Sequence, residues 1–139
     1  LPRGGGDRDA ARRLTVPRGD VRIRGSDGRL LCARCRVADS FTSRFRGLLG
    51  ASALPAGEGL LIRGTSSVHT HFMRFSIDVV FLDADGRVLR VVRNLRPWRA
   101  AGRRGARDVL ELAAGECERV GLEEGDVLAE EPAEDAAAS

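Results

Sequence analysis

The chain contains no tyrosine and no lysine, and its aromatic content is low. Among 139 residues the aromatic share is 4%, and Trp98 is the only tryptophan. Proteins that hold single-stranded nucleic acid stack its bases on aromatic side chains, so no nucleic-acid partner is expected. All 23 basic residues are arginines, scattered along a chain whose net charge is +3. We therefore interpret the arginine excess as the codon bias of a GC-rich genome, although arginine does favour phosphate groups.

Cysteines and long apolar runs are also scarce. The three cysteines are an odd number, which argues against a framework of paired disulfides. No apolar run approaches the roughly 20 residues that span a bilayer, and no hydrophobic core of a signal peptide is visible. The sequence therefore predicts a monomer without a transmembrane segment. Its expected location is the cytoplasm as written, or the cell envelope if an N-terminal signal has been removed.

The remaining composition predicts one domain between two solvated tails. Residues 1–19 are rich in arginine and glycine, and residues 130–139 are acidic and alanine-rich, so neither tail has the apolar periodicity of a packed element. Residues 20–129 carry the apolar patterns. A chain of this length with 42% hydrophobic residues can bury a core without a metal or disulfide scaffold.

Short β-prone runs separated by turn residues dominate the central domain. Two hairpins are predicted, 21–24 with 30–37 around Ser26-Asp27-Gly28, and 77–82 with 88–92 around Asp83-Ala84-Asp85-Gly86. Further strands are expected at 59–62, 67–73, 108–112 and 126–128, with one or two helical turns within 114–120 and a mobile basic loop at 96–104. Many short strands at this spacing are typical of a sandwich or a barrel, so the expected fold is mainly β.

One amphipathic helix is predicted near residues 41–49. Ser40 is a suitable N-cap, and Gly50 can end the helix in a left-handed conformation. The apolar residues between them recur at the spacing of a single helical face: Phe41, Phe45, Leu48 and Leu49. This face is expected to pack on the sheet.

The spacing of Cys32 and Cys35 resembles that of zinc ribbons and redox dithiols. Both lie in a predicted strand, however, where residues three apart point to opposite faces. A zinc site also needs two further ligands, and Cys117 with a histidine supplies them only if the fold brings them together. We therefore expect separate, inert thiols rather than a metal or redox site.

The alternation of His69, His71 and Met73 is the clearest candidate for metal binding. On an extended strand these three side chains project from one face, and imidazoles at that spacing can bind a transition metal. The other interpretations are a structural histidine and, for His69, a general base, because the ordinary pKa of histidine is near 6.5. A structural or hydrogen-bonded histidine is favoured, and no metal or other cofactor is expected.

Five motifs in register give the chain a resemblance to a known family. They are Arg44-Phe45-Arg46-Gly47-Leu48-Leu49-Gly50, the block from His69 to Asp78, Val79 to Gly86, Val109-Leu110-Glu111-Leu112 with Gly115, and Gly125-Asp126. Their order and spacing resemble the bacterial and archaeal domain of unknown function 192 family over roughly residues 31–128. The resemblance implies a jelly-roll-like β-sandwich, or a partly open barrel, with one small helix, and it implies no reaction. The family commonly has an aromatic residue at the position of His71, so a metal site shared by the family cannot depend on His71.

The charged residues that match these motifs are the candidate ligand-binding residues. They are Arg44, Arg74, Asp78 and Glu111, to which His69 is added. Charged side chains are costly to bury unless they are paired, so these residues form either a salt-bridge network or an anion or polar-ligand pocket.

The function that we expect is a non-enzymatic binding or accessory module. It would bind an unknown small ligand or protein partner in a polar cleft near His69–Asp78 and Glu111. The first alternative is a metal-assisted or acid–base enzyme of hydrolase type, with His69 and Asp78 as catalytic candidates. The second alternative is a protein-interaction module with an exposed apolar patch.

Overall fold

The computed structural model describes residues 20–39 and 53–133, which form nine strands and one short helix. Seven strands make one sheet in the order β6-β5-β8-β3-β2-β1-β9, and β4 pairs with β7 in a separate two-stranded ribbon. The elements are β1 (Val21–Gly25), β2 (Leu30–Asp39), β3 (Glu58–Arg63), β4 (Ser67–His69), β5 (Ile77–Leu82), β6 (Val88–Leu95), β7 (Ala100–Gly102), β8 (Asp108–Ala113), α3 (Glu116–Arg119) and β9 (Leu128–Pro132).

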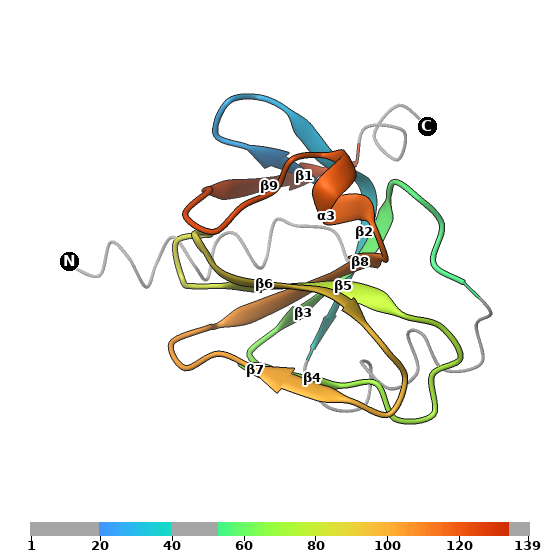
Figure 1. The fold of residues 1–139 in the computed structure, drawn as a ribbon. Helices are drawn as coiled ribbons and strands as arrows, with labels where there is room; N and C mark the ends of the chain where they lie inside the picture. Colours follow the sequence, from blue (N-terminus) through green and yellow to red (C-terminus); the bar gives the residue numbers. More distant parts are fainter. Residues whose placement is uncertain (1–19, 40–52, 134–139) are drawn as a thin grey trace.

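The large sheet curls strongly and forms a half-barrel (Figure 1). Its neighbouring strands pair antiparallel except β2 and β3, which pair parallel. The prediction of a mainly β, partly open barrel is confirmed, and a jelly-roll arrangement stays a prediction. The helix expected near 41–49 lies outside the described residues.

Both predicted hairpins are confirmed. β1 pairs with β2, and β5 pairs with β6. In the second hairpin the Asp83 carboxylate accepts hydrogen bonds from the backbone N–H groups of Asp85 and Arg87, at 2.8 and 3.0 Å. Gly86 follows with a φ of 85°, a left-handed conformation that glycine adopts without steric cost. The turn chemistry in the sequence therefore sets this reversal.

Each face of the curled sheet buries its own apolar cluster. One cluster, which includes Leu61, Val80 and Leu110, packs with β1, β2 and α3. The other includes Leu60, Val79 and Phe81, and it packs against Val68 of β4 and Ala101 of β7. Figure 1 shows α3 above the sheet and the β4–β7 ribbon below it. We call these two sides of the sheet the helix side and the ribbon side.

Several boundaries differ from the predicted ones, and β6, for example, extends to Leu95 rather than ending at residue 92. The strand expected at 67–73 ends at His69, and the loop expected at 96–104 contains β7, because β4 and β7 pair from Ser67 with Gly102 to His69 with Ala100. β9 extends to Pro132, three residues into the expected tail, since this segment pairs with the edge of β1. Glu131 there lies 3.2 Å from Arg24. These pairings join segments far apart in sequence, which local patterns do not reveal.

Candidate functional site

Two turns at one end of the β4–β7 ribbon gather four rings. The ring centroids of His69 and His71 lie 4.7 Å apart, those of His71 and Trp98 5.3 Å, and those of Phe72 and Trp98 4.7 Å. Phe72 is 62% exposed and Trp98 is 55% exposed. We call His69, His71, Phe72 and Trp98 the aromatic tip. Trp98 therefore does not stand alone, as it does in the sequence, but contacts His71 and Phe72.

Thr70 holds the two turns of the aromatic tip together. Its side chain is fully buried, and its hydroxyl donates to the carbonyl of Arg96 at 2.5 Å and accepts from the N–H of Arg99 at 2.9 Å. Its backbone N–H donates to Arg99, and its carbonyl accepts from the N–H groups of Met73 and Trp98. A single buried residue thus fixes both turns, and this makes the exposed rings part of a preformed surface.

Backbone strain accompanies this exposure. Phe72 has a φ of 69° and Trp98 has a φ of 64°. Bulky residues rarely adopt this left-handed region, and each such residue costs on the order of 1–3 kcal/mol. Strain of this kind persists where the surrounding structure fixes it, and here the Thr70 hydrogen bonds do so. The fold therefore stabilises an arrangement that leaves two large apolar side chains in solvent.

The segments that carry the aromatic tip are strongly basic. Residues 64–77 and 95–107 contain no aspartate or glutamate, while the whole chain has a net charge of only +3. Their six arginines are all exposed, and none forms an ion pair with the described part of the chain: Arg74, Arg96, Arg99, Arg103, Arg104 and Arg107. We call these arginines the basic face. Some arginines elsewhere are paired with glutamates, for example Arg24 and Arg63.

Asp78 is a buried structural carboxylate. It is fully buried in β5 and accepts hydrogen bonds from the backbone N–H groups of Asn94 at 2.9 Å, Gly115 at 3.1 Å and Cys117 at 2.9 Å. It pairs across the strands with Leu112, which places it on the helix side of the sheet. It thus anchors the turn into α3, and it does not face the ribbon that carries His69.

Glu111 projects to the other side of the sheet. It is 3% exposed, and its strand partners Leu60 and Val79 belong to the cluster on the ribbon side. Glu111 and His69 therefore share a side of the sheet, and a common cleft for them stays a prediction. Arg74 is exposed in the turn beside Phe72. Arg44 lies outside the described residues.

The predicted strand with His69, His71 and Met73 on one face is not present. β4 ends at His69, and the left-handed Phe72 turns the chain away before Met73. The two imidazoles nevertheless meet through the turn rather than through a strand. Within residues 20–39 and 53–133, no group of three or more His, Cys, Asp and Glu side chains is placed to hold a metal ion.

The prediction that Cys32 and Cys35 face opposite sides of a strand is wrong. In the pairing of β1 with β2, Val21 opposes Cys35 and Ile23 opposes Cys32, so β2 contains one extra residue at this point. Such a bulge turns residues three apart toward the same face. Both thiols are buried in the core on the helix side, as is Cys117. The bulge is fixed by the carbonyl of Gly57, which accepts from two successive backbone N–H groups of β2.

The environment of each thiol determines its acidity. The hydrogen bond between the two side chains lowers the pKa of Cys32 and raises that of Cys35 well above its ordinary value. Burial, with the nearby Asp78 carboxylate, raises the pKa of Cys117 to about 12.

We expect all three cysteines to resist alkylation in the folded protein. The reactive species is the thiolate, and a thiol reagent needs access to the sulfur, which burial denies to each of them. Iodoacetamide labelling at pH 8, followed by mass spectrometry, should modify the thiols only at the rate of unfolding. Rapid labelling of Cys32 and Cys35 in the folded state would show that the core opens at the bulge.

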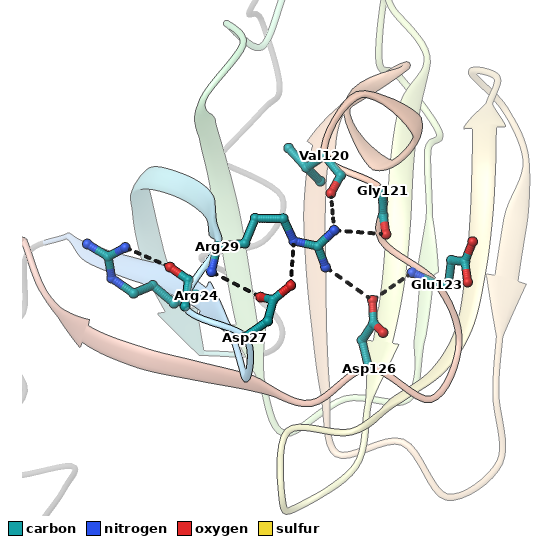
Figure 2. Close-up of polar contacts among 8 residues, drawn as sticks. Arg24, Asp27, Arg29, Val120, Gly121, Glu123 and Asp126 are labelled. Atoms are coloured by element: carbon teal, nitrogen blue, oxygen red, sulfur yellow. Dashed lines mark hydrogen bonds and ion pairs between the residues drawn. The ribbon is translucent and has the colours of Figure 1, made fainter.

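Arg29 is a charged residue whose role the sequence does not indicate. Figure 2 shows its guanidinium between the first hairpin and the turn after α3. It donates to the carbonyls of Val120 at 2.6 Å and Gly121 at 3.3 Å, and it lies 3.7 Å from the Asp126 carboxylate. These partners are more than 90 residues away in sequence, so no local motif identifies them. The contacts explain Asp126 of the family motif as a structural residue.

The fold and this set of residues define a mainly β domain with a preformed aromatic tip and a basic face. A profile of the family DUF192, described as "Uncharacterized ACR", matches residues 22–129. The chain belongs to this family.

Named relatives and a solved structure agree with this assignment. The chain is 32% identical over 111 residues to a UPF0127 protein of Thermococcus sibiricus, covering 76% of this chain and 71% of that protein. It is 40% identical over 97 residues to a UPF0127 protein of Pyrococcus horikoshii, covering 67% and 84%. A crystal structure of a protein of unknown function from the bacterium Novosphingobium aromaticivorans has a TM-score of 0.67, 22% identity, and coverage of 79% and 83%. The two named relatives are archaeal.

Proposed function

We propose that this chain is a non-enzymatic binding or accessory module whose binding surface is the aromatic tip together with the basic face. The observation that carries the proposal is the arrangement around Thr70. Its buried hydrogen bonds hold two strained turns so that Phe72 and Trp98 stay exposed. A protein gains no stability from exposed large apolar side chains, and such patches often mark interaction sites.

The charge around the tip indicates the kind of partner. Six exposed arginines without a described carboxylate partner favour an anionic group, because guanidinium binds carboxylates and phosphates through two parallel N–H donors. The adjacent rings favour an apolar or planar portion of the same partner. The proposed partner class is therefore an anion that also offers apolar surface. This proposal keeps His69 and Arg74 of the predicted site and assigns Asp78 to structure.

The enzyme alternative receives less support than the binding proposal. Its acid–base pair was His69 with Asp78, and catalytic partners must lie within hydrogen-bonding reach. Asp78 points to the helix side of the sheet and its carboxylate is occupied by three backbone N–H groups. A reaction at this site would thus have to use His69 without that carboxylate.

A generic polyanion tests the binding proposal. We expect dextran sulfate at low ionic strength to raise the melting temperature and to change the emission of Trp98, while neutral dextran does neither. Because Trp98 is the only tryptophan and the chain has no tyrosine, its emission reports on the aromatic tip directly. The variant Arg74→Ala/Arg104→Ala should weaken the response, and Arg87→Ala/Arg93→Ala, with the same loss of charge elsewhere, should not. Equal responses of both variants would refute the proposed surface.

Thr70→Val is expected to loosen the aromatic tip. The substitution keeps the size of the side chain but removes a hydroxyl that bridges two turns, leaving the carbonyl of Arg96 and an N–H of Arg99 without that partner. The cost should be about 2–3 kcal/mol. Urea denaturation measures this loss, and acrylamide quenching of Trp98 should change in the folded variant. Unchanged stability and quenching would show that Thr70 does not hold the turns.

A further inference from the structure

We propose that the partner of this surface is the anionic face of a lipid bilayer, onto which the domain docks peripherally with Phe72 and Trp98 in the headgroup region. This inference rests on the proposed binding surface and names its partner. The described part of the chain has no helix long and apolar enough to cross a membrane. The contact would therefore be made at the surface.

The position and packing of the rings favour a bilayer over a stacked planar ligand. Phe72 and Trp98 lie at two adjacent turns and not on the open face of a sheet. The planes of the Phe72 and Trp98 rings are inclined by 59°, and those of His71 and Trp98 by 60°. Tilted rings in mutual contact form an apolar wedge and leave no parallel slot for a base. Tryptophan and other amphipathic aromatic side chains are enriched where a membrane meets water.

The arginines complete the match with an anionic surface. Arg74, Arg96 and Arg99 flank the aromatic tip, while Arg103 and Arg104 follow β7 at the other end of the ribbon. Three residues of strand separate the two groups, which is about 10 Å. This separation exceeds the screening length of about 8 Å at physiological ionic strength, so each group attracts an anionic surface largely on its own. Each arginine that reaches an anionic leaflet strengthens binding about fivefold.

Arginine also suits the apolar wedge beside it. Its long aliphatic stem can lie along apolar groups while the guanidinium stays with the phosphates. In segments 64–77 and 95–107 no carboxylate is present to repel an anionic leaflet. The same surface thus offers apolar contact at its tip and exposed positive charge around it.

Vesicle titration with the full chain tests the proposal. The probes are vesicles of phosphatidylcholine alone and vesicles with an equal part of phosphatidylglycerol, at low and high sodium chloride. We expect co-flotation and a blue shift of Trp98 emission with the anionic vesicles, weakening steeply as salt rises. The neutral vesicles should bind at least tenfold more weakly. Absence of co-flotation with the anionic vesicles at low salt would overturn the proposal.

Matched variants separate the two contributions. Phe72→Ala should weaken binding to anionic vesicles about tenfold, whereas Leu30→Ala, at another exposed apolar side chain, should leave it unchanged. Arg74→Ala/Arg104→Ala should weaken it about 25-fold, and Arg87→Ala/Arg93→Ala should have little effect. Equal losses in the test and control variants would mean that binding does not use this surface.

A single-stranded oligonucleotide titrated in parallel identifies which proposal fails. If Trp98 responds to the oligonucleotide or to dextran sulfate but not to anionic vesicles, the binding surface stands and the lipid partner is wrong. Tighter binding to the oligonucleotide than to the vesicles would likewise overturn the lipid partner. If Trp98 responds to no polyanion and to neither vesicle, both proposals are wrong.

Discussion

Asp78→Ala is expected to destabilise the domain by about 4 kcal/mol. The carboxylate is fully buried and accepts three backbone hydrogen bonds from two separate segments, one at Asn94 and the other at Gly115 and Cys117. Removing it leaves three N–H donors without this acceptor, and a donor that stays buried without a partner costs about 1–3 kcal/mol. Urea denaturation, monitored by circular dichroism, measures the change in the free energy of unfolding.

Two further variants sharpen the test of Asp78. Asp78→Asn should recover less than half of the loss in stability. The amide NH2 group would point at a backbone N–H group that now donates to a carboxylate oxygen, and two donors cannot bond to each other. Asp85→Ala, at an exposed aspartate in a hairpin turn, should change stability by less than about 0.5 kcal/mol. A small effect of Asp78→Ala would mean that water or a neighbouring side chain replaces the carboxylate. In that case the assignment of Asp78 to structure would be wrong.

Gly86→Ala is expected to cost about 4 kcal/mol as well. Gly86 has a φ of 85°, and a Cβ atom there would lie 2.3 Å from the carbonyl oxygen of Leu128. That carbonyl belongs to backbone fixed by the hydrogen bond from the Leu128 N–H to the Gly86 carbonyl at 2.8 Å. The cost therefore combines a left-handed conformation, about 1–2 kcal/mol, with displacement of the start of β9.

Gly28→Ala is a matched control for the close contact between the Cβ atom added at Gly86 and the carbonyl oxygen of Leu128. Gly28 also lies in a hairpin turn, with a φ of 88°, but no atom lies within 4 Å of the position of its added Cβ. Only the conformational cost remains, so the expected loss is about 1 kcal/mol. The difference between the two variants in thermal or urea unfolding measures the backbone contact. Equal losses would show that the Leu128 segment moves aside freely.

The expected location of the binding surface changes once the tertiary structure is known. The family motifs identified His69, Arg74, Asp78 and Glu111 as one group, because they share motifs and charge. The pleat of the sheet separates two of them. Asp78 pairs with Leu112 and Glu111 pairs with Val79, so the side chains of Asp78 and Glu111 point to opposite sides of the sheet. The exposed tip, in contrast, depends on Trp98, which is isolated in the sequence and meets Phe72 only because β4 and β7 pair.

The same reasoning explains the cysteines. Regular alternation along a strand predicts opposite faces for Cys32 and Cys35, and a single extra residue in β2 reverses that result. A bulge is determined by the partner strand and by Gly57, whose carbonyl accepts both N–H groups of the bulge. Neither is visible in the local sequence.

The sequence by itself determined the family, the mainly β class and both hairpins. These follow from local information: turn residues such as Asp83 and Gly86, β-prone runs on either side, and motifs in fixed order. Only the tertiary structure decided which charged residues are buried and which rings meet at the surface. The physical reason is that backbone hydrogen bonds between distant segments set three features: the side of the sheet to which a side chain points, the bulges and the long-range strand pairing. Side-chain patterns within one segment do not specify these features.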